Sequence, residues 1–184
     1  TLLPLREPIT LKQQHTEKVV IGWTGSHSTL PYLDVIYPVL RKIEKNFDIE
    51  FLVICNQAPH FSMQSMQFIP WKEATEIDDL LRINIGVMPL KQDAWSEGKC
   101  GFKIIQYLSL GIPAIASPVG VNKQIIEEAQ NGYLCNSDEE WYSALSKLIK
   151  DAQLRQAMGA AGRHKMVAQY SITANAEKFI SLFS

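Results

Sequence analysis

Short apolar segments alternate with segments of helical periodicity along most of this sequence. Continuous apolar runs of this length are typical of parallel strands that are buried on both faces. We predict strands over residues 18–26, 48–56, 66–71, 83–90, 113–119 and 132–135. Because parallel neighbours in a sheet need crossover connections, this order predicts an α/β fold with a doubly wound, mostly parallel, Rossmann-like sheet. Such sheets bind ligands beyond the carboxyl ends of their strands.

Segments of helical periodicity follow most of the predicted strands. We predict helices over residues 28–47, 76–81 and 122–130, another from Lys99 or Cys100 to Gly111, and two or three in the tail over 138–183. Pro38 should kink the first helix or delay its start. Asn131 and Gly132 should form a left-handed cap after helix 122–130. The tail helices are amphipathic and are expected to cover the sheet.

Length and composition limit the classes of protein to which the chain can belong. Its 184 residues suit one domain, or one domain with an appendage. The formal net charge of -1 gives no overall field that would attract nucleic acid or an anionic membrane. The three cysteines are far apart and form no CxxC pair, which indicates reduced thiols and argues against a zinc site. We therefore expect a cytoplasmic protein that binds no nucleic acid.

Residues 1–17 differ from the rest of the chain. They contain Pro4, Pro8 and two glutamines, and they lack a basic segment followed by an apolar one. No run of about 18 apolar residues, the length that spans a membrane, occurs in the sequence. We expect an interdomain linker or leader over residues 1–17, one domain over 18–184, and no secretion signal.

Two lysines and two glycines gather where a predicted helix follows a predicted central strand. The first backbone amides of a helix have no partner within it and carry a partial positive charge, so they favour an anion. Gly98 and Gly101 would let an anion approach the backbone, and Lys99 and Lys103 add two charges on one side. The pattern predicts a diphosphate site. The alternative is that both lysines are solvated and that the glycines only close a turn.

The loop after the first predicted strand is a second candidate for phosphate contacts. It contains neither the GxGxxG fingerprint of dinucleotide-binding proteins nor the GxxxxGK[ST] motif of P-loop proteins. Gly25, Ser26 and Thr29 still offer backbone and hydroxyl donors to a phosphate. His27 is either a donor that faces the ligand or a solvated loop residue.

Several segments together carry a family likeness. They are "VIGWTGSHSTLPYL", "DAWSEGKCGFKIIQYLSLGIPAIASPVGVNKQII", "NGYL", "SDEEW" and "LRQAMGAAGRHKM". In this order they resemble the carboxy-terminal, donor-binding half of GT-B-fold retaining glycosyltransferases of family 4, also called group 1, over residues 18–180. The resemblance implies a single GT-B half-domain with extra C-terminal helices. In this family the last helix crosses back onto the amino-terminal half, so residues 172–183 would expose apolar surface when that half is absent. It also implies a site for a nucleotide diphosphate sugar, bound without a metal or another cofactor.

The sequence departs from the pattern of this family in two places. The family commonly shows two glutamates eight residues apart, the first near the sugar and the second on the ribose. Gln106 stands where the resemblance places the second glutamate, and Glu97 is displaced by one residue from the first. A glutamine can accept hydrogen bonds from ribose hydroxyls but carries no charge. The usual arginine and lysine after the first strand are also missing, and Lys99 with Lys103 could replace them.

The resemblance implies a role for each candidate residue. Lys103 would stabilise the leaving diphosphate, and Glu97 would hydrogen-bond the transferred sugar. The other binding residues would be Gly25, Ser26, Trp71, Lys99, Gly101 and Gln106. Trp71 would lie against the nucleobase, although its position in the sequence suits a core residue equally well.

The function implied is that of the donor-binding half of a glycosyltransferase that transfers a sugar from a nucleotide diphosphate sugar to an acceptor with retention. The amino-terminal half, which holds the acceptor in this family, has no counterpart in the chain, so the chain alone should be inactive. Peripheral association of the full-length enzyme with the inner face of a membrane stays open. One alternative is a non-catalytic nucleotide-binding module with a degenerate site. Another is an unrelated doubly wound protein, such as a receiver or an isomerase, with no affinity for UDP or GDP.

Overall fold

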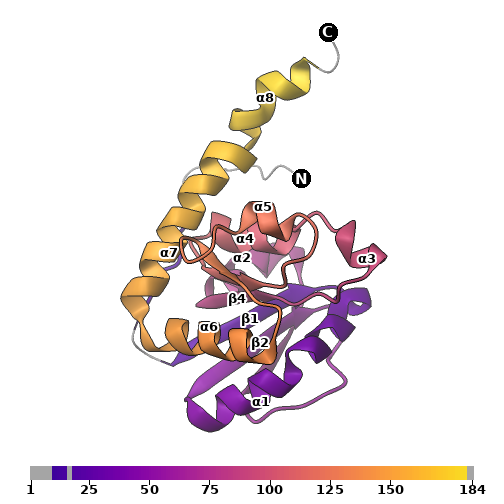
Figure 1. The fold of residues 1–184 in the computed structure, drawn as a ribbon, viewed down its shortest axis with the longest axis vertical. Coiled ribbons are helices and arrows are strands. Elements are labelled where there is room, and N and C mark those ends of the chain that lie inside the picture. The colour runs from indigo at the N-terminus through magenta and orange to yellow at the C-terminus, as the bar shows by residue number, and fades with distance from the viewer. Residues whose placement is uncertain (1–9, 16–17, 182–184) are drawn as a thin grey trace.

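The central element of the computed structural model, which describes residues 10–15 and 18–181, is a six-stranded sheet (Figure 1). The strand order is β3-β2-β1-β4-β5-β6, and every neighbouring pair is parallel. The strands are β1 (Val19–Gly25), β2 (Ile49–Cys55), β3 (Met66–Pro70), β4 (Ile85–Met88), β5 (Ala114–Ala116) and β6 (Gly132–Leu134). Each lies within a run predicted from the sequence, and the doubly wound α/β fold is confirmed.

Helices connect the strands and continue after the last one. Those before β4 are the 3₁₀-helix η1 (His27–Val35), α1 (Tyr37–Asn46), the 3₁₀ turn η2 (Glu73–Thr75) and α2 (Glu76–Leu81). Those between β4 and β6 are α3 (Ala94–Glu97), α4 (Phe102–Ser109) and α5 (Asn122–Ile125). The tail forms α6 (Asp138–Lys150), α7 (Ala152–Lys165), the π-helix η3 (Met166–Tyr170) and α8 (Ile172–Ile180).

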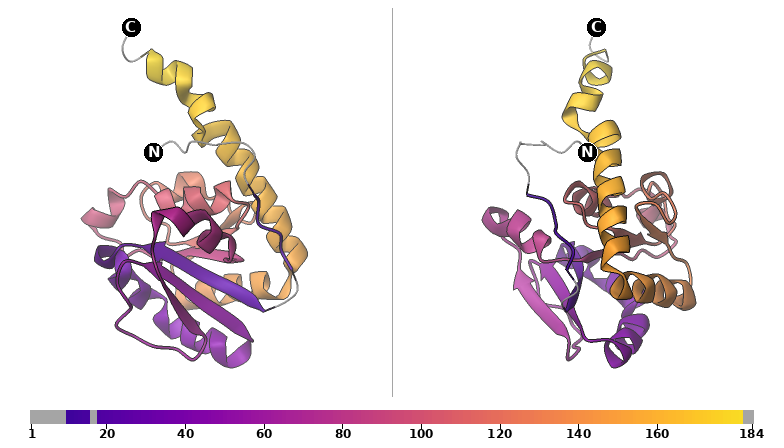
Figure 2. Two further views of the ribbon diagram at one scale, coloured as in Figure 1. Left: turned by 180° about the vertical axis from the view of Figure 1, so that it is seen from behind. Right: turned by 90° about the vertical axis from the view of Figure 1, so that its left-hand side faces the viewer.

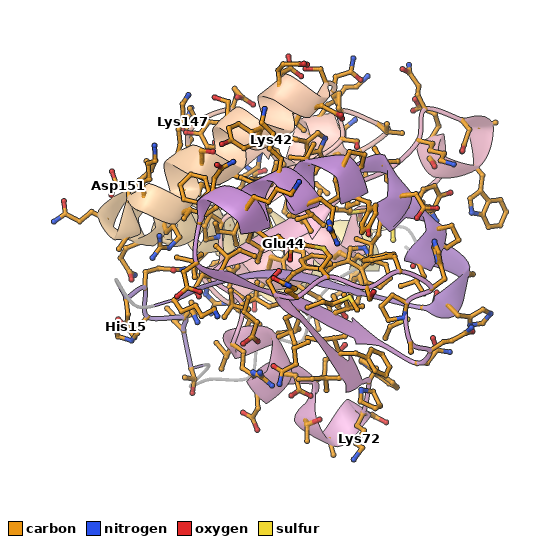
Figure 3. The ribbon with its side chains drawn as sticks, turned by 90° about the horizontal axis from the view of Figure 1, so that it is seen from below. His15, Lys42, Glu44, Lys72, Lys147 and Asp151 are labelled. Carbon is orange, nitrogen blue, oxygen red and sulfur yellow. The ribbon has the colours of Figure 1, made fainter. Side chains whose placement is uncertain are left out.

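Helices cover both faces of the sheet (Figure 2). On one face α1 and α6 lie side by side, and Figure 3 shows Lys42 and Lys147 on the outer side of this pair. The opposite face is covered by α2, α4 and α5. Along β2, Phe51 belongs to the core under α1 and α6, whereas Leu52 belongs to the core under α2 and α4. Because successive strand residues point to opposite faces, double coverage requires the continuous apolar runs seen in the sequence.

Prolines set the start of α1. Pro38 lies in the first turn of the helix, where the missing backbone N–H leaves no hydrogen bond broken. The preceding segment, which contains Pro31, forms η1 instead of α-helix. The predicted helix over residues 28–47 is therefore divided in two, and the delayed start at Pro38 is confirmed.

The helix predicted over residues 122–130 is wrong in length and in its cap. The helix α5 ends at Ile125, and the left-handed residue that follows is Ala129, with φ of 60°. The Asn131 side chain accepts a hydrogen bond from Glu127 N at 2.9 Å and donates one to Ile125 O at 3.1 Å. Asparagine amides often compete in this way with helical hydrogen bonds, and here the amide stabilises a turn.

The tail helices form an arm that begins on the sheet layer and extends beyond it (Figure 1). α7 packs closely on α4, since a Cβ atom added at Gly159 would lie 2.0 Å from Gly111 O. α8 lies beyond the sheet, and Ile172 and Ile180 on it are 46% and 66% exposed. α8 therefore does not cover the sheet, and its exposed apolar side chains agree with the expectation that the last helix exposes apolar surface.

Part of the predicted leader is ordered against the body. The Lys12 backbone N–H donates to Leu110 O at 2.8 Å, and Arg155 donates to Gln14 Oε1 and His15 O at 2.9 and 2.6 Å. Residues 1–9 and 16–17 of this leader lie outside the described residues. None of the described helices is both long and apolar enough to cross a membrane.

Candidate functional site

A cavity of about 400 Å³ opens at the carboxyl ends of β1, β2 and β3. The strand order reverses between β1 and β4 beside it, which is where open α/β sheets form ligand crevices. Its walls come from the ends of these strands and from the amino-terminal turns of α2 and α4. The lining residues are Thr24, Gly25, Ser26, Asn56, Trp71, Glu76, Phe102, Lys103 and Gln106.

One wall of the cavity is cationic because Lys103 projects from the first turn of α4. Its Nζ atom lies 5.5 Å from the centre of the Trp23 ring, and Trp23 is buried. Burial and then the charge of Lys99 lower the pKa of Lys103 to about 8. No hydrogen bond or ion pair joins the Lys103 side chain to the described part of the chain. Lys103 is therefore a half-buried cation that a bound anion would stabilise.

Lys99 occupies a different position from Lys103. Its Nζ lies 5.1 Å from the centre of the Tyr32 ring and 5.7 Å from that of Trp95, and Lys99 is not among the residues that line the cavity. Trp95 is 77% exposed on the short helix α3. The structure therefore brings only one of the two predicted lysines into the cavity.

The start of α4 differs from the predicted start at Lys99 or Cys100. The helix begins at Phe102, and its N-cap Gly101 has φ of 66°. A Cβ atom at Gly101 would lie 2.3 Å from Ile125 Cδ1. This left-handed backbone conformation favours glycine independently of any ligand, whereas the Ile125 side chain could shift to relieve the contact. Gly101 is buried and does not line the cavity.

Glu97 connects two loops instead of facing the cavity. Its Oε2 atom accepts a hydrogen bond from Gly120 N at 3.0 Å, in the turn between β5 and α5. Gly120 has φ of 53°, and a Cβ atom there would lie 2.7 Å from Glu97 O. Asp93 caps the same short helix α3 by accepting from Ser96 N at 2.7 Å, and this hydrogen bond lowers the pKa of Asp93. Glu97 thus helps to fix the loop that precedes α4.

A second set of cavity residues carries hydrogen-bond acceptors. Glu76 Oε1 accepts from Trp71 Nε1 at 3.1 Å and from Gln106 Nε2 at 3.2 Å. Glu76 Oε2 receives no hydrogen bond from the described residues. One N–H of the Gln106 amide is bonded to Glu76, and its carbonyl oxygen can accept a hydrogen bond from a ligand. Two acceptor oxygens are thus held on one side of the cavity.

Of the predicted binding residues, Trp71, Gln106, Gly25 and Ser26 also line this cavity. Trp71 is 42% exposed and lines the cavity, so it is not a core residue. Glu76 was not identified from the sequence. Its only signal was its place at the start of the predicted helix 76–81, because its partner Gln106 is 30 positions away along the chain.

Asn56 is a further cavity residue that the sequence did not indicate. Its Oδ1 atom accepts from His27 N at 2.8 Å, and its Nδ2 atom lies 3.2 Å from His27 Nδ1. This pair fixes the loop after β1, and the exposed His27 is thereby bonded to the loop after β2. Thr24 N donates to the hydroxyl of buried Tyr107 at 3.0 Å, and burial raises the pKa of that hydroxyl. The first loop is therefore held in place from two sides.

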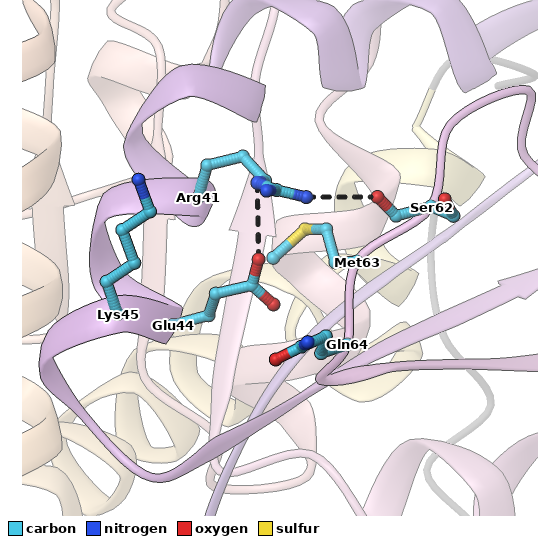
Figure 4. A pocket seen from close by; sticks show the side chains of 6 residues that line it. All are labelled: Arg41, Glu44, Lys45, Ser62, Met63 and Gln64. Atoms are coloured by element: carbon cyan, nitrogen blue, oxygen red, sulfur yellow. Dashed lines mark hydrogen bonds and ion pairs between the residues drawn. The ribbon is translucent and has the colours of Figure 1, made fainter.

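A larger hollow of about 700 Å³ lies elsewhere, beside α1 and the segment that leads into β3 (Figure 4). Its carboxylate, Glu44, already accepts hydrogen bonds from Ser65 N and Oγ and pairs with Arg41 at 3.3 Å. Arg41 also donates to Ser62 O at 3.5 Å. Because these polar groups are hydrogen-bonded to one another, the hollow has fewer free groups for a ligand than the cavity at the strand ends.

Among the described residues no group of histidine, cysteine, aspartate or glutamate side chains could hold a metal ion.

Solved structures with the same fold include several glycosyltransferases. The C-terminal domain of a glycosyl transferase group 1 family protein, LpcC, from Francisella tularensis has a TM-score of 0.68 at 18% identity and covers 89% of this chain and 97% of that chain. Anabaena Alr3699/HepE, in complex with UDP and glucose, has a TM-score of 0.72 at 13% identity, and covers 91% of this chain and 49% of that one. A mutant of S. aureus TarM, in complex with Fondaparinux, alpha-GlcNAc-glycerol and UDP, has a TM-score of 0.75 at 15% identity and covers 100% of this chain and 38% of that one.

The chain thus spans less than half the length of the last two proteins. No curated protein sequence matches it significantly. The family described as glycosyl transferases group 1 matches residues 52–165, which is more than half of the 184 residues. The chain therefore belongs to the group 1 glycosyl transferases.

Proposed function

We propose that this chain is the donor-binding half of a glycosyltransferase that takes a sugar from a nucleotide diphosphate sugar and transfers it to an acceptor with retention. The observation that carries the proposal is the polarity of the cavity. The cavity presents the cation of Lys103 and the backbone of the loop after β1, together with acceptor oxygens of Glu76 and Gln106. A nucleoside diphosphate has the matching polarity, with an anionic end and a hydroxyl-bearing end.

Each wall suits one part of the donor. Lys103, with donors from Gly25 and Ser26, would hold the diphosphate and stabilise the charge that accumulates on it as it leaves. Glu76 Oε2 and the Gln106 carbonyl would accept hydrogen bonds from the ribose hydroxyls. Trp71, fixed by its bond to Glu76, would offer its exposed ring to the nucleobase. Lys99 would add to the positive potential from behind Lys103 without direct contact.

Glu97 enters the proposal in a changed form. In the ligand-free chain its Oε2 atom is bonded to Gly120 N. The contact between Glu97 and the transferred sugar, which the family resemblance implies, would therefore use Oε1 or require the bond to Gly120 to break. Gly101 would act by fixing the entry to α4 and not by admitting a phosphate.

Solved neighbours support the assignment to a nucleotide. Two of them, Anabaena Alr3699/HepE and S. aureus TarM, are in complexes that contain UDP. Since this chain spans only part of each, the acceptor is expected to be held by another part of the same enzyme, and the chain alone should not turn over. We propose no requirement for a metal, which an unchanged affinity for UDP in the presence of EDTA would test. We also propose that the full-length enzyme is cytoplasmic and associates peripherally with the membrane. Fractionation of cells would test this location.

The decisive experiment is isothermal titration of the chain with UDP and with GDP. The proposal predicts saturable binding of at least one of them, lost or strongly weakened in Lys103→Ala. Unchanged affinity in that variant would show that the diphosphate does not lie at α4. The absence of binding by either nucleotide would contradict the donor-site assignment as a whole.

One observation favours a second candidate function, a nucleotide-binding module without catalysis. Glu97 is bonded to the backbone outside the cavity, and Gln106 carries no charge, so no carboxylate from α3 or α4 faces the cavity. Such a module would bind the nucleotide through the same walls. Assay of the full-length polypeptide for sugar transfer separates the two functions, because only the enzyme forms a glycosylated product.

A further inference from the structure

Two short helices, α2 and α4, each begin at the cavity, beside the carboxyl ends of the strands, and end beside the amino ends of the strands. Glu76 is the first residue of α2, whose carbonyl end is at Leu81 and Arg82. Phe102 and Lys103 begin α4, which ends at Ser109 with Leu110 as its C-cap. A displacement at the far end of either helix would therefore move a wall of the cavity.

A single leader residue is bonded to both of these far ends. The Lys12 side chain donates from Nζ to Leu81 O at 2.8 Å and to Arg82 O at 3.1 Å. Its backbone N–H donates to Leu110 O at 2.8 Å. These carbonyl groups belong to the helix ends, where no intrahelical donor is available and where the macrodipole favours a cation. Lys12 thus links α2 to α4 at the edge opposite the cavity.

Packing alone holds α2 weakly. Leu80 is its one buried side chain, whereas Ile77 on the same helix is 50% exposed. At the cavity end, the direct bond between α2 and α4 is that from Gln106 Nε2 to Glu76 Oε1, at 3.2 Å. With so little apolar burial, the position of α2 depends on polar bonds at its two ends, and Lys12 supplies those at one end.

The described segment 10–15 is firmly held at Gln14 and His15. Gln14 Oε1 accepts from Arg155 Nε at 2.9 Å and from Asn84 Nδ2 at 3.0 Å, and Gln14 Nε2 donates to Asn84 O at 3.2 Å. Arg155 is 1% exposed and also donates to His15 O and Leu148 O, both at 2.6 Å. A residue two positions from such an anchor can hold the two helix ends at a fixed separation.

We propose that Lys12 is a positioning residue that sets the separation of α2 and α4 and thereby keeps Glu76 against Gln106 at the cavity. The proposal concerns the position of Glu76 and can be tested without a ligand. It rests on the proposed function only in the test that measures nucleotide affinity. Residues of the leader would then govern how well the ligand site is formed, although they lie at the opposite edge of the sheet.

The test replaces Lys12 by methionine, which keeps the alkyl chain and removes the amine. The matched control is Lys18→Met, which also removes one lysine charge but breaks only an exposed ion pair with Asp48. The first readout needs no ligand: the indole N–H resonance of Trp71 in ¹⁵N spectra, assigned with Trp71→Phe, reports the bond to Glu76. We expect Lys12→Met to shift this resonance and speed its hydrogen exchange, and Lys18→Met to leave it in place.

The second readout is affinity for UDP and GDP, measured well below the melting temperature. Mutations that act on a binding site from a distance usually change its affinity only modestly. We therefore expect about fivefold weaker nucleotide binding in Lys12→Met and unchanged binding in Lys18→Met. A Lys12→Met protein that melts at a lower temperature but keeps both the Trp71 resonance and the affinity would overturn the inference. If wild type binds neither nucleotide, the proposed function fails, and the Trp71 resonance still decides the role of Lys12.

A reciprocal measurement covers the case in which Lys12→Met does not fold. Because Lys12 holds the far end of the helix that begins at Glu76, loss of the Glu76 side chain should disturb the surroundings of Lys12. In protein labelled at lysine Cε, Glu76→Ala should therefore shift the Lys12 resonance and leave that of Lys18 unchanged. An unmoved Lys12 resonance would contradict the proposal.

Discussion

The two walls of the cavity differ in how they are built. The cationic wall comes from one local motif, in which Lys103 follows Gly101 at the start of α4. The acceptor wall is assembled from separate segments, since Trp71 follows β3, Glu76 begins α2 and Gln106 lies within α4. A local motif can be recognised from spacing in the sequence, whereas an assembled wall exists only when the fold brings its members together. The two walls should therefore respond differently to substitution.

The largest effect is expected for the cationic wall. Lys103→Ala should weaken binding of a nucleoside diphosphate by about 1.5 to 3 kcal/mol, the range for a hydrogen bond to a charged group. Binding of the corresponding nucleoside should hardly change, because it lacks the diphosphate. Isothermal titration of both ligands measures the difference, and equal losses for the two would show that Lys103 does not contact the phosphates.

The pH dependence of affinity should follow the same lysine. Because the pKa of Lys103 is lowered to about 8, its positive charge is lost in the free protein as pH rises from 7 to 9. Affinity for UDP or GDP should fall by up to about tenfold over this range, with a midpoint shifted upward by the bound anion. Lys103→Arg, which keeps its charge, should bind equally at pH 7 and 9. A flat profile in wild type would contradict this account.

The stability of the ligand-free chain should change with pH in the opposite sense. In the folded state Lys103 has its pKa lowered from 10.5 to about 8, so between these values the unfolded chain binds more protons. Stability contributed by this group therefore rises as pH increases from about 8 toward 10.5. Lys12, whose pKa burial also lowers to about 8, contributes a similar rise in both proteins. Thermal melts should therefore show a steeper rise in wild type than in Lys103→Met, and parallel profiles would exclude Lys103 as a cause.

Substitution in the acceptor wall should have a smaller and more selective effect. Glu76→Gln replaces a charged acceptor by a neutral one and should cost about 1 kcal/mol of the preference for UDP over its 2′-deoxy analogue. Comparing these two ligands removes the repulsion between Glu76 and the phosphates, because both carry the same diphosphate. An unchanged preference would show that Glu76 does not contact the ribose.

The smallest effect is expected from the bond that positions this wall. Trp71→Phe keeps an aromatic face for the base but removes the donor to Glu76 Oε1. The expected loss of UDP affinity is about 0.5 to 1 kcal/mol, the net contribution of a single hydrogen bond. Trp95→Phe is the control, since Trp95 does not line the cavity and should leave the affinity unchanged. A larger loss from Trp95→Phe than from Trp71→Phe would place the base elsewhere.

The sequence predicted the sheet well because its signal is strong and local. Strands buried on both faces must be apolar throughout, and each of the predicted runs contains a strand. The errors lie where a single side chain changes the backbone, as Asn131 does when it closes a turn in place of a helix cap. The start of α4 was placed too early because Gly101 adopts a left-handed conformation, which composition does not reveal.

The candidate site was predictable only in part, for the same reason. The lysines and glycines at the start of a predicted helix pointed to Lys103. Lys99, in contrast, lies over Tyr32 and Trp95 and does not reach the cavity. Glu76 and Asn56 reach the cavity through contacts with residues about 30 positions away, and spacing in the sequence carries no signal for such contacts. Glu97 has the residue type expected near a sugar, yet its carboxylate accepts a hydrogen bond from the backbone N–H of Gly120.

The most direct test is a crystal structure of the chain soaked with UDP or GDP. The account predicts diphosphate oxygens within hydrogen-bonding distance of Lys103 Nζ and the ribose hydroxyls against Glu76 and Gln106. A nucleotide bound in another place, or a cavity without ligand density while Lys103 points into bulk solvent, would contradict it.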